Sequence, residues 1–221
     1  MITRAEQDAT ARRVAGLGYT PVLAPLLRVH SLLLRPTPDP AAVLISSSNA
    51  LPSLPAALHD VPLLAVGDAT SERARAAGFR RVSSAGGDAE ALLALARISQ
   101  PPGAALLLAT GRGQGGHLAA GLRTAGFRVY RRTVYAAVPV PRLPLAAMTA
   151  LRADTLQAAL FLSAETARIF VRLLPPALHL ALARIDALAI GQSAAETLSL
   201  LPWRRVRVSV RPTLDDVLAL L

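Results

Sequence analysis

The sequence predicts an α/β protein built from two related halves. Its 221 residues are 52% hydrophobic with a mean hydropathy of +0.42, as expected where parallel strands are buried on both faces. Short apolar runs alternate with helical patterns, and two segment types each occur twice, in the order A, B, A′, B′. Because single domains most often have roughly 100–150 residues, we expect two small domains that arose from one ancestor by duplication.

The A segments are helices that end at a glycine and lead into a strand. Residues 3–27 align with residues 111–135 at an offset of 108, which places Gly18 opposite Gly126. Glycine commonly closes a helix because it adopts the left-handed conformation readily. A full apolar run, Ala104–Leu108, comes before the second copy, whereas only two residues come before the first. The first strand is therefore truncated, or it begins upstream of the present start.

The B segments are short buried strands that end at a small polar turn and open a helix. The first pair is "AAVLISSSNAL" from Ala41 and "AALFLSAETAR" from Ala158, at an offset of 117. The second pair is "LAVGDATSERARAAGFRRV" from Leu64 and "LAIGQSAAETLSLLPWRRV" from Leu188, at an offset of 124. This strand-turn-helix pattern is typical of parallel α/β sheets.

Two proline-rich stretches mark how the copies are divided. "RPTPDP" at residues 35–40 lies between A and B, and "VPVPRLP" at residues 138–144 lies between A′ and B′. Proline at this density forms stiff, extended linkers that cannot join a central sheet. The chain then crosses twice between two lobes, which predicts a cleft between them. The expected parts are a discontinuous domain at 1–32 plus 140–221, an inserted domain at 38–135, and crossing linkers at 33–40 and 134–146.

Every B strand leads into a turn of hydroxyl, amide or glycine residues. Ligands of open α/β sheets bind at the carboxyl ends of the strands, and the exposed amides of helix N-termini favour anions. Any single turn of this kind can be a plain helix cap. Four of them in two domains predict an anion-lined cleft. The turns are Ser46–Asn49, Gly67–Thr70, Ser163–Thr166 and Gly191–Ser193.

Charge and composition narrow the class of ligand. All 24 basic residues are arginine and exceed the 14 acids by 10, which favours anionic partners such as polycarboxylates or nucleotides. An aromatic content of 4% and scattered arginines argue against a nucleic-acid ligand.

No stretch of the sequence is apolar enough for a membrane span, and we expect a cytoplasmic location. Without cysteine, and with four scattered histidines, no metal site is expected.

The loop before the second A helix has the glycine spacing of a dinucleotide-binding site. Gly111, Gly113 and Gly116 follow an apolar run and precede a helical pattern. About 20 residues on, where such a site carries an acid, the chain has Arg131–Arg132, which would suit NADP.

The first A helix opens without glycine, and the two copies share only an arginine, Arg4 and Arg112. We therefore interpret the glycines as incidental to a loop at the cleft edge. An NADP-dependent oxidoreductase and a non-catalytic, two-lobed carboxylate-binding protein stay open as alternatives.

Several motifs, in order, resemble those of the uroporphyrinogen-III synthase family over nearly the whole chain. They are "VLISSSNAL", "AVGDAT", "LFLSAETA", "LAIGQSAAETL" and "RPTLDDVLALL". The resemblance implies two similar flavodoxin-like, parallel-sheet domains joined by a two-stranded linker. It implies a monomeric, cofactor-free lyase of haem, sirohaem and cobalamin biosynthesis that converts hydroxymethylbilane, a linear tetrapyrrole polycarboxylate, into uroporphyrinogen III with loss of water and inversion of ring D. It leaves open a transient contact with hydroxymethylbilane synthase.

The resemblance also implies residue roles. Tyr135, in "RRTVYAA", matches a tyrosine near the leaving hydroxyl, and a phenol with a pKa near 10 is a proton donor at neutral pH. The alternative is a linker tyrosine that only packs its ring. Ala194 stands where relatives commonly have threonine. The residues expected to bind substrate are Arg4, Ser47, Asn49, Gly67, Asp68, Thr70, Arg112, Ser163, Gly191, Gln192 and Ser193.

Overall fold

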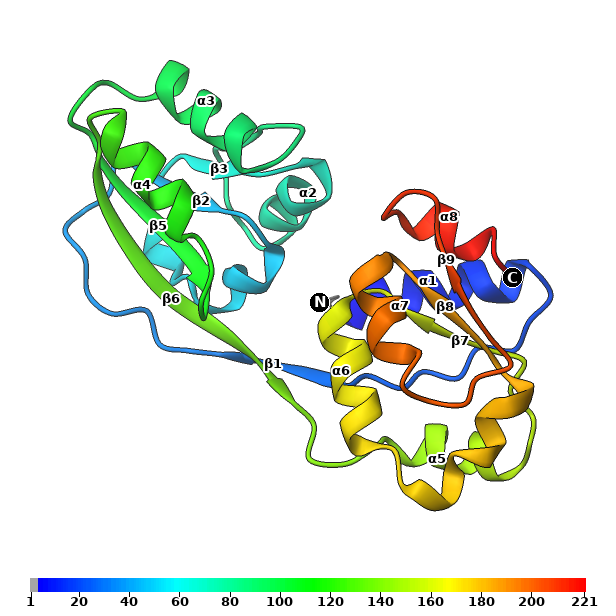
Figure 1. The fold of residues 1–221 in the computed structure, drawn as a ribbon. Coiled ribbons are helices and arrows are strands. Elements are labelled where there is room, and N and C mark those ends of the chain that lie inside the picture. Colours follow the sequence, from blue (N-terminus) through cyan, green and yellow to red (C-terminus); the bar gives the residue numbers. More distant parts are fainter. Residues whose placement is uncertain (1–3) are drawn as a thin grey trace. The chain divides into compact units, whose positions relative to one another are not determined.

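The chain divides into two compact α/β units in the computed structural model, which describes the backbone of residues 4–221 and the side chains from residue 7 onward. Unit 1 consists of Met1–Arg28 and Val138–Leu221, and unit 2 is Val29–Ala137 (Figure 1). The parallel sheets confirm the α/β class.

Unit 2 contains most of a six-stranded sheet with the order β1-β6-β5-β2-β3-β4. Neighbours from β6 to β4 are parallel. β1 runs antiparallel to β6, because the Leu26 carbonyl accepts from the Val140 amide while the Leu32 amide donates to the Val134 carbonyl. The strands are β1 (Leu27–Ser31), β2 (Ala42–Ile45), β3 (Leu63–Ala65), β4 (Val82–Ser84), β5 (Ala105–Gly111) and β6 (Arg128–Pro139).

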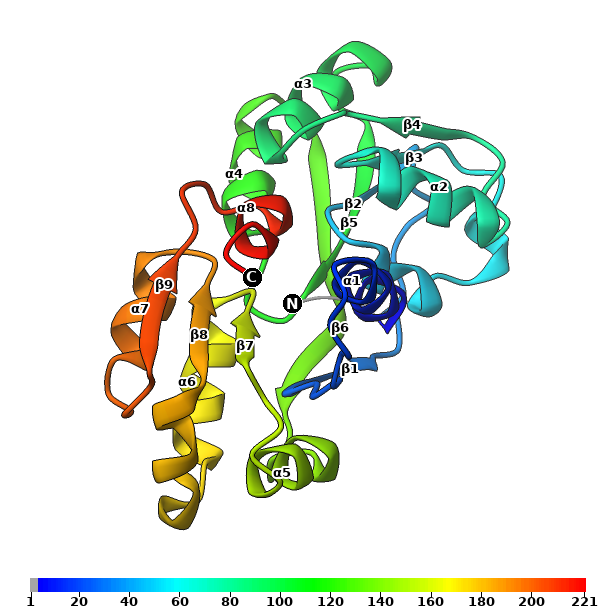
Figure 2. The same ribbon diagram turned by 90° about the vertical axis from the view of Figure 1, so that its right-hand side faces the viewer.

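Helices cover both faces of this sheet. Val43 and Ile45 of β2 pack toward η1 and α2, whereas Ala42 and Leu44 pack toward α3 and α4. All four of these side chains are fully buried because successive residues of a strand point to opposite faces. Figure 2 shows α2 and α4 on opposite sides of the strands. The helices are η1 (Ser48–Ser53), η2 (Ala56–Leu58), α2 (Asp68–Ala76), α3 (Ala89–Ser99) and α4 (Gly116–Thr124).

Unit 1 contains a three-stranded parallel sheet with the order β7-β8-β9. One cluster of buried side chains forms the core of this unit. It includes Phe161, Phe170 and Trp203, whose ring centroids lie 5.2–5.8 Å apart. The strands are β7 (Ala158–Phe161), β8 (Asp186–Ala189) and β9 (Arg205–Val208). The helices are α1 (Arg4–Gly16), α5 (Leu145–Arg152), α6 (Ala164–Leu173), η3 (Pro176–Leu178), η4 (Leu180–Arg184), α7 (Gln192–Leu198) and α8 (Leu214–Leu218).

The chain passes between the units within two paired strands, β1 and β6. Residues 33–40, expected as the first crossing linker, lie in unit 2 instead. The crossing occurs earlier because β1 is extended by hydrogen bonding to β6, and proline is not what sets it.

The turns that repeat in the sequence form equivalent helix N-caps in the two units, and the structure corrects one residue correspondence of the alignment. Gly67 and Gly191 are both extended N-caps, as their alignment predicts. Ser47 and Ser163 are both serine N-caps whose side chains accept a backbone N–H. Ser163 therefore corresponds to Ser47, and not to Ser46 as the offset of 117 implies. The sequence alignment slipped by one residue because both turns are rich in small polar side chains.

The two A segments match at their ends and differ at their beginnings. Gly18 and Gly126 both adopt positive φ angles, +88° and +89°, which confirms the predicted closures. The strand expected directly after Gly18 does not form, since residues 19–26 have no regular structure and β1 begins only at Leu27. Arg112 lies in a turn before α4, whereas Arg4 is the first residue of α1, so the two arginines are not equivalent in structure.

Among the described residues, no single helix is long and apolar enough to cross a membrane. One pair, Ala164–Leu173 with Pro176–Arg184, reaches that length and composition only together and is bent by 106°.

Candidate active site

A buried phenol lies at the carboxyl edge of the unit 2 sheet. Tyr135 of β6 is 1% exposed, and its hydroxyl donates to Gln114 Oε1 at 2.8 Å. Burial raises the pKa of the Tyr135 phenol above its usual value of 10.0, and hydrogen bonds from the Ser47 side chain and the Gly111 backbone partly oppose this rise. The phenol is therefore protonated at neutral pH and directs its proton into the turn after β5.

Gly111 is required by the close approach of this ring. A Cβ atom there would lie 2.7 Å from two atoms of the Tyr135 ring and 2.8 Å from Gln114 Oε1. Gly115 has a φ of +74°, and a Cβ on it would lie 2.4 Å from the Thr110 side chain. The interpretation of this loop's glycines as incidental is thus wrong for Gly111 and Gly115, whose bare faces are covered by side chains of the same unit. A Cβ on Gly113 would meet nothing within 4 Å, and one on Gly116 only Arg131 at 3.5 Å.

Register places three turns side by side at this edge. Ile45 of β2 pairs with Ala65 of β3 and with Ala109 of β5, so the residues after these three strands are neighbours. A register shift at Thr110 and Gly111 bends the end of β5 and brings Gly111 opposite Tyr135. Such bulges commonly re-aim side chains beside functional sites. The sequence therefore folds the Ser47 and Gly111 turns against one phenol, and the Gly67 turn follows along the same edge.

The turn after β2 has a cationic neighbour that sequence reasoning missed. Arg73 of α2 donates from Nη1 to Ser48 Oγ at 2.9 Å and is half-buried. Ser47 accepts the Asn49 amide at 3.3 Å, and Asn49 itself is 9% exposed. Arg73 belongs to a helix with several arginines, so no pattern distinguished it; its place one helical turn after Thr70 was the available signal.

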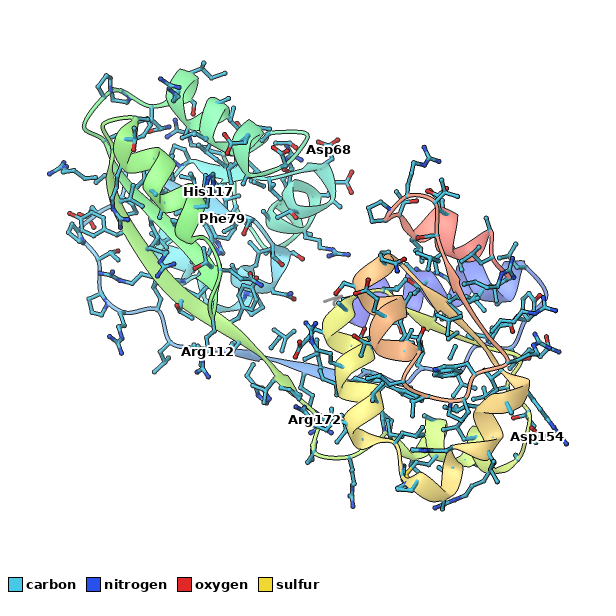
Figure 3. The ribbon with its side chains drawn as sticks, in the orientation of Figure 1. Asp68, Phe79, Arg112, His117, Asp154 and Arg172 are labelled. Atoms are coloured by element: carbon cyan, nitrogen blue, oxygen red, sulfur yellow. The ribbon has the colours of Figure 1, made fainter. Side chains whose placement is uncertain are left out.

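The turn after β3 leaves helix-opening amides without a side-chain cap. Gly67 caps α2 with no side-chain hydrogen bond, and Asp68 and Thr70 occupy the first turn. Asp68 is exposed and Thr70 half-buried. Arg112, in the turn after β5, is exposed, and Figure 3 shows it on a separate part of the unit from Asp68. Asp68 and Arg112 are thus not brought together.

The remaining predicted residues belong to unit 1. Ser163 accepts the Thr166 amide at 3.1 Å, so its oxygen caps α6. Gly191 caps α7 without a side-chain bond, and Gln192 and Ser193 are exposed. Because β7 and β8 are neighbours, these two turns share one edge of the unit 1 sheet. The side chain of Arg4 lies outside the described residues.

Among the side chains that the structure describes, no group of three or more histidines and acids gathers as metal ligands. The groups that the described part of unit 2 offers for chemistry are the Tyr135 phenol, which can donate a proton, and the hydroxyls, amides and the Arg73 and Arg112 guanidinium groups, which suit anions.

The fold and site define an α/β protein with a neutral phenol and turns of hydroxyl and amide groups at the carboxyl edge of its parallel sheet. The family model for uroporphyrinogen-III synthase HemD matches residues 8–219. The chain therefore belongs to the uroporphyrinogen-III synthase family, and with it to the cyclising lyases of tetrapyrrole biosynthesis, which act on a small-molecule tetrapyrrole.

A solved structure agrees at the level of the fold. The uroporphyrinogen-III synthetase of Helicobacter pylori 26695 is 20% identical with a TM-score of 0.61, over 88% of this chain and 89% of its own. A mutant uroporphyrinogen III synthase of the extremely thermophilic bacterium Thermus thermophilus is 19% identical with a TM-score of 0.47, over 99% and 94% of the two chains. A search of curated proteins gave no match.

Proposed function

We propose that Tyr135 is the acid with which this chain converts hydroxymethylbilane into uroporphyrinogen III, with loss of water and inversion of ring D. The observation that carries the proposal is a phenol that is 1% exposed, has a raised pKa, and hydrogen-bonds to Gln114 at the ligand edge of the sheet. A group in this state holds a proton at neutral pH and can pass it to a departing oxygen.

The proton balance of the reaction fits one such donor. Tyr135 transfers its proton to the ring A hydroxyl, which leaves as water, and the remaining azafulvene cation is conjugated with the pyrrole nitrogen. Ring D attacks through its substituted carbon, and the resulting spiro intermediate fragments and recloses. The proton released when the last ring regains aromaticity restores the phenol. In the free protein this phenol donates to Gln114, so the substrate hydroxyl must displace that acceptor.

Holding the substrate in the right orientation contributes more to catalysis than proton transfer does, because the azafulvene cation also closes to the unflipped isomer without a catalyst. Well-held geometry can contribute roughly 7–11 kcal/mol to lowering a barrier. We propose that the carboxylates are held by the Ser47 and Gly67 turns with Arg73 and Arg112 in unit 2, and by the Ser163 and Gly191 turns in unit 1. Arginine suits this role through its bidentate fit to carboxylate.

We also propose that the two units arose by duplication and keep flavodoxin-like layouts. The matched caps Ser47 and Ser163, and Gly67 and Gly191, support this origin. A monomer in the cytoplasm, with or without transient contact with hydroxymethylbilane synthase, completes the proposal.

The test supplies enzymatically generated hydroxymethylbilane to the purified chain and separates the oxidised porphyrins by isomer. We expect type III porphyrin, formed faster than spontaneous closure. Type I porphyrin alone, at the uncatalysed rate, would refute the proposal. Because spontaneous closure consumes the same substrate, a parallel reaction without protein gives the reference rate.

A further inference from the structure

The side chain that accepts the Tyr135 proton in the free protein is an amide, which can both accept and donate hydrogen bonds. Gln114 Oε1 lies 2.8 Å from the Tyr135 hydroxyl oxygen. A glutamine amide carries a carbonyl oxygen and an NH2 group on the same carbon atom. The last torsion of glutamine is broad and roughly two-fold, so half a turn exchanges the acceptor for the donor. Gln114 can therefore serve the phenol in either of its protonation states.

The backbone around Gln114 is held in place by a tight turn. The Gln114 amide donates to the Gly111 carbonyl at 3.0 Å, which closes a β-turn with Gly113 as its third residue. Gly113 has a φ of +75°, and a positive φ at this position is what a type II turn requires. The Arg112 amide within this turn donates to the Tyr135 carbonyl at 2.9 Å. These bonds fix where the Gln114 side chain begins relative to the phenol.

The ring of Tyr135 and the amide of Gln114 share the space that Gly111 leaves open. A Cβ atom on Gly111 would lie 2.7 Å from two ring atoms and 2.8 Å from Gln114 Oε1. The two side chains differ in exposure, since Tyr135 is 1% exposed and Gln114 is exposed. The terminal amide of Gln114 therefore has room to turn while the ring stays in place.

The step assigned to Tyr135 leaves a negative charge in a buried place. When the phenol O–H bond breaks, the proton passes to the departing ring A oxygen and the electron pair stays on the phenol oxygen. A buried anion is costly unless hydrogen-bond donors face it. The Ser47 side chain and the Gly111 backbone bond this oxygen and favour its anion, but burial outweighs them and raises the pKa of the Tyr135 phenol. A further donor is therefore needed after proton transfer.

We propose that Gln114 is a positioning residue whose amide accepts from the Tyr135 phenol before proton transfer and donates to the phenolate afterwards. The inference rests on the proposed role of Tyr135 as the acid. The substrate hydroxyl takes the place of Gln114 Oε1, and half a turn of the amide then brings Nε2 to the phenol oxygen. A hydrogen bond to an anion is about twice as strong as a neutral one. The amide keeps both of its protons, and it turns back when the last pyrrole ring returns a proton to the phenol.

The first experiment compares two replacements of Gln114 that cannot donate. Gln114→Met removes both functions without adding a charge, and Gln114→Glu keeps an acceptor of the same length. We expect kcat for type III formation to fall about tenfold or more in both, with a smaller change in KM. The matched control is Gln100→Glu, at the C-terminal cap of α3 in the same unit, which should keep the parent's kcat. A parent-like kcat in either Gln114 variant would overturn the proposal.

The second experiment follows the Tyr135 phenol itself and needs no substrate. An alkaline titration measures phenolate absorbance, and the Tyr135→Phe protein gives the contribution of Tyr19 and Tyr130. Gln114→Met should raise the pKa of the Tyr135 phenol, because the amide bonds the phenolate more strongly than it bonds the neutral phenol. An amide that only accepted would stabilise the neutral form, and its removal would lower this pKa. A lowered or unchanged pKa therefore contradicts the donating role.

A double variant separates the failure of this inference from the failure of the proposed function. Because Gln114 acts through the phenol, adding Gln114→Met to Tyr135→Phe should not lower kcat further. A full additional loss in the double variant would show that Gln114 acts independently and would reject the inference. A Tyr135→Phe protein that keeps the parent's rate overturns the proposed function. A slow Tyr135→Phe protein beside a Gln114→Met protein with the parent's kcat overturns only the role of Gln114.

Discussion

Replacing Tyr135 by phenylalanine removes one hydroxyl and leaves the packing around it intact. The ring fits against Gly111, where even a Cβ atom would be too close, so phenylalanine should keep its place. The lost hydrogen bond is the one to Gln114, 2.8 Å long, and Gln114 is exposed, so water can satisfy its freed oxygen. The cost in unfolding free energy should therefore be small, about 1 kcal/mol.

The effect on rate should be larger than the effect on stability. General acids typically contribute about 10²–10⁴-fold, and a hydroxyl that leaves readily without help places this case at the low end. We expect Tyr135→Phe to slow type III formation by about 10- to 100-fold while the KM for the bilane changes little, because the phenol acts in the transition state.

The assay measures type III porphyrin formation at several substrate concentrations, alongside urea unfolding of the same proteins. Tyr130→Phe is the matched control, since Tyr130 lies on the same strand, is half-buried, and has Arg132 over its ring 5.9 Å away. A Tyr135→Phe protein with a rate within about twofold of the parent would refute the assignment. Equal losses in both variants would also do so, since they would reflect the strand and not the phenol.

Three further outcomes follow from the described contacts. Gly111→Ala should lower the unfolding free energy measured in urea by about 1–3 kcal/mol and lower the rate of type III formation, because the new Cβ displaces the Tyr135 ring. The control Gly116→Ala should change neither quantity, since its Cβ would meet only Arg131 at 3.5 Å. Equal stabilities of the two variants would contradict the close approach of Tyr135 to Gly111. Arg73→Gln should raise the KM for the bilane severalfold at unchanged kcat, with the exposed Arg75→Gln as control; an unaltered KM would exclude a substrate contact. The hydrogen bond from Arg204 lowers the pKa of the Asp186 carboxyl below 3.8. The stabilisation that this ion pair gives the folded protein is therefore present above that pH and is lost as pH falls through the lowered pKa. The gap in unfolding free energy between the parent and Asp186→Asn should narrow between about pH 5 and pH 3, and a constant gap would refute the ion pair.

The sequence predicted what local chemistry determines. Alternating apolar strands and small polar turns gave the α/β class, and the glycines Gly18 and Gly126 were placed correctly because a left-handed cap is a property of one residue. The caps Ser47 and Ser163 could be recognised for the same reason, since a serine reaches amides only two or three residues ahead. Their exact correspondence still needed the structure.

Contacts between segments that are far apart in the sequence could not be predicted from local sequence patterns. Gly111 and Tyr135 are 24 residues apart in sequence, and nothing local to either indicates that a ring and a bare backbone meet. Arg73 and Ser48 belong to different segments of the chain, so their hydrogen bond could not be predicted from the residues next to either one. The failed strand at 19–26 shows the converse: its residues favour a strand, but strand formation depends on a neighbour elsewhere.

The two units share their turns but not their phenol. In the alignment of the A segments, Leu27 stands opposite Tyr135, and Thr3 opposite Gly111. The A segment of unit 1 therefore has no tyrosine at the position aligned with Tyr135 and no glycine at the position aligned with Gly111. Turns with hydroxyl and amide groups occur in both units, whereas the buried Tyr135 phenol belongs to unit 2. A substrate with carboxylates on every ring but one leaving hydroxyl matches that asymmetry, since its binding groups are repeated and its reacting group is single.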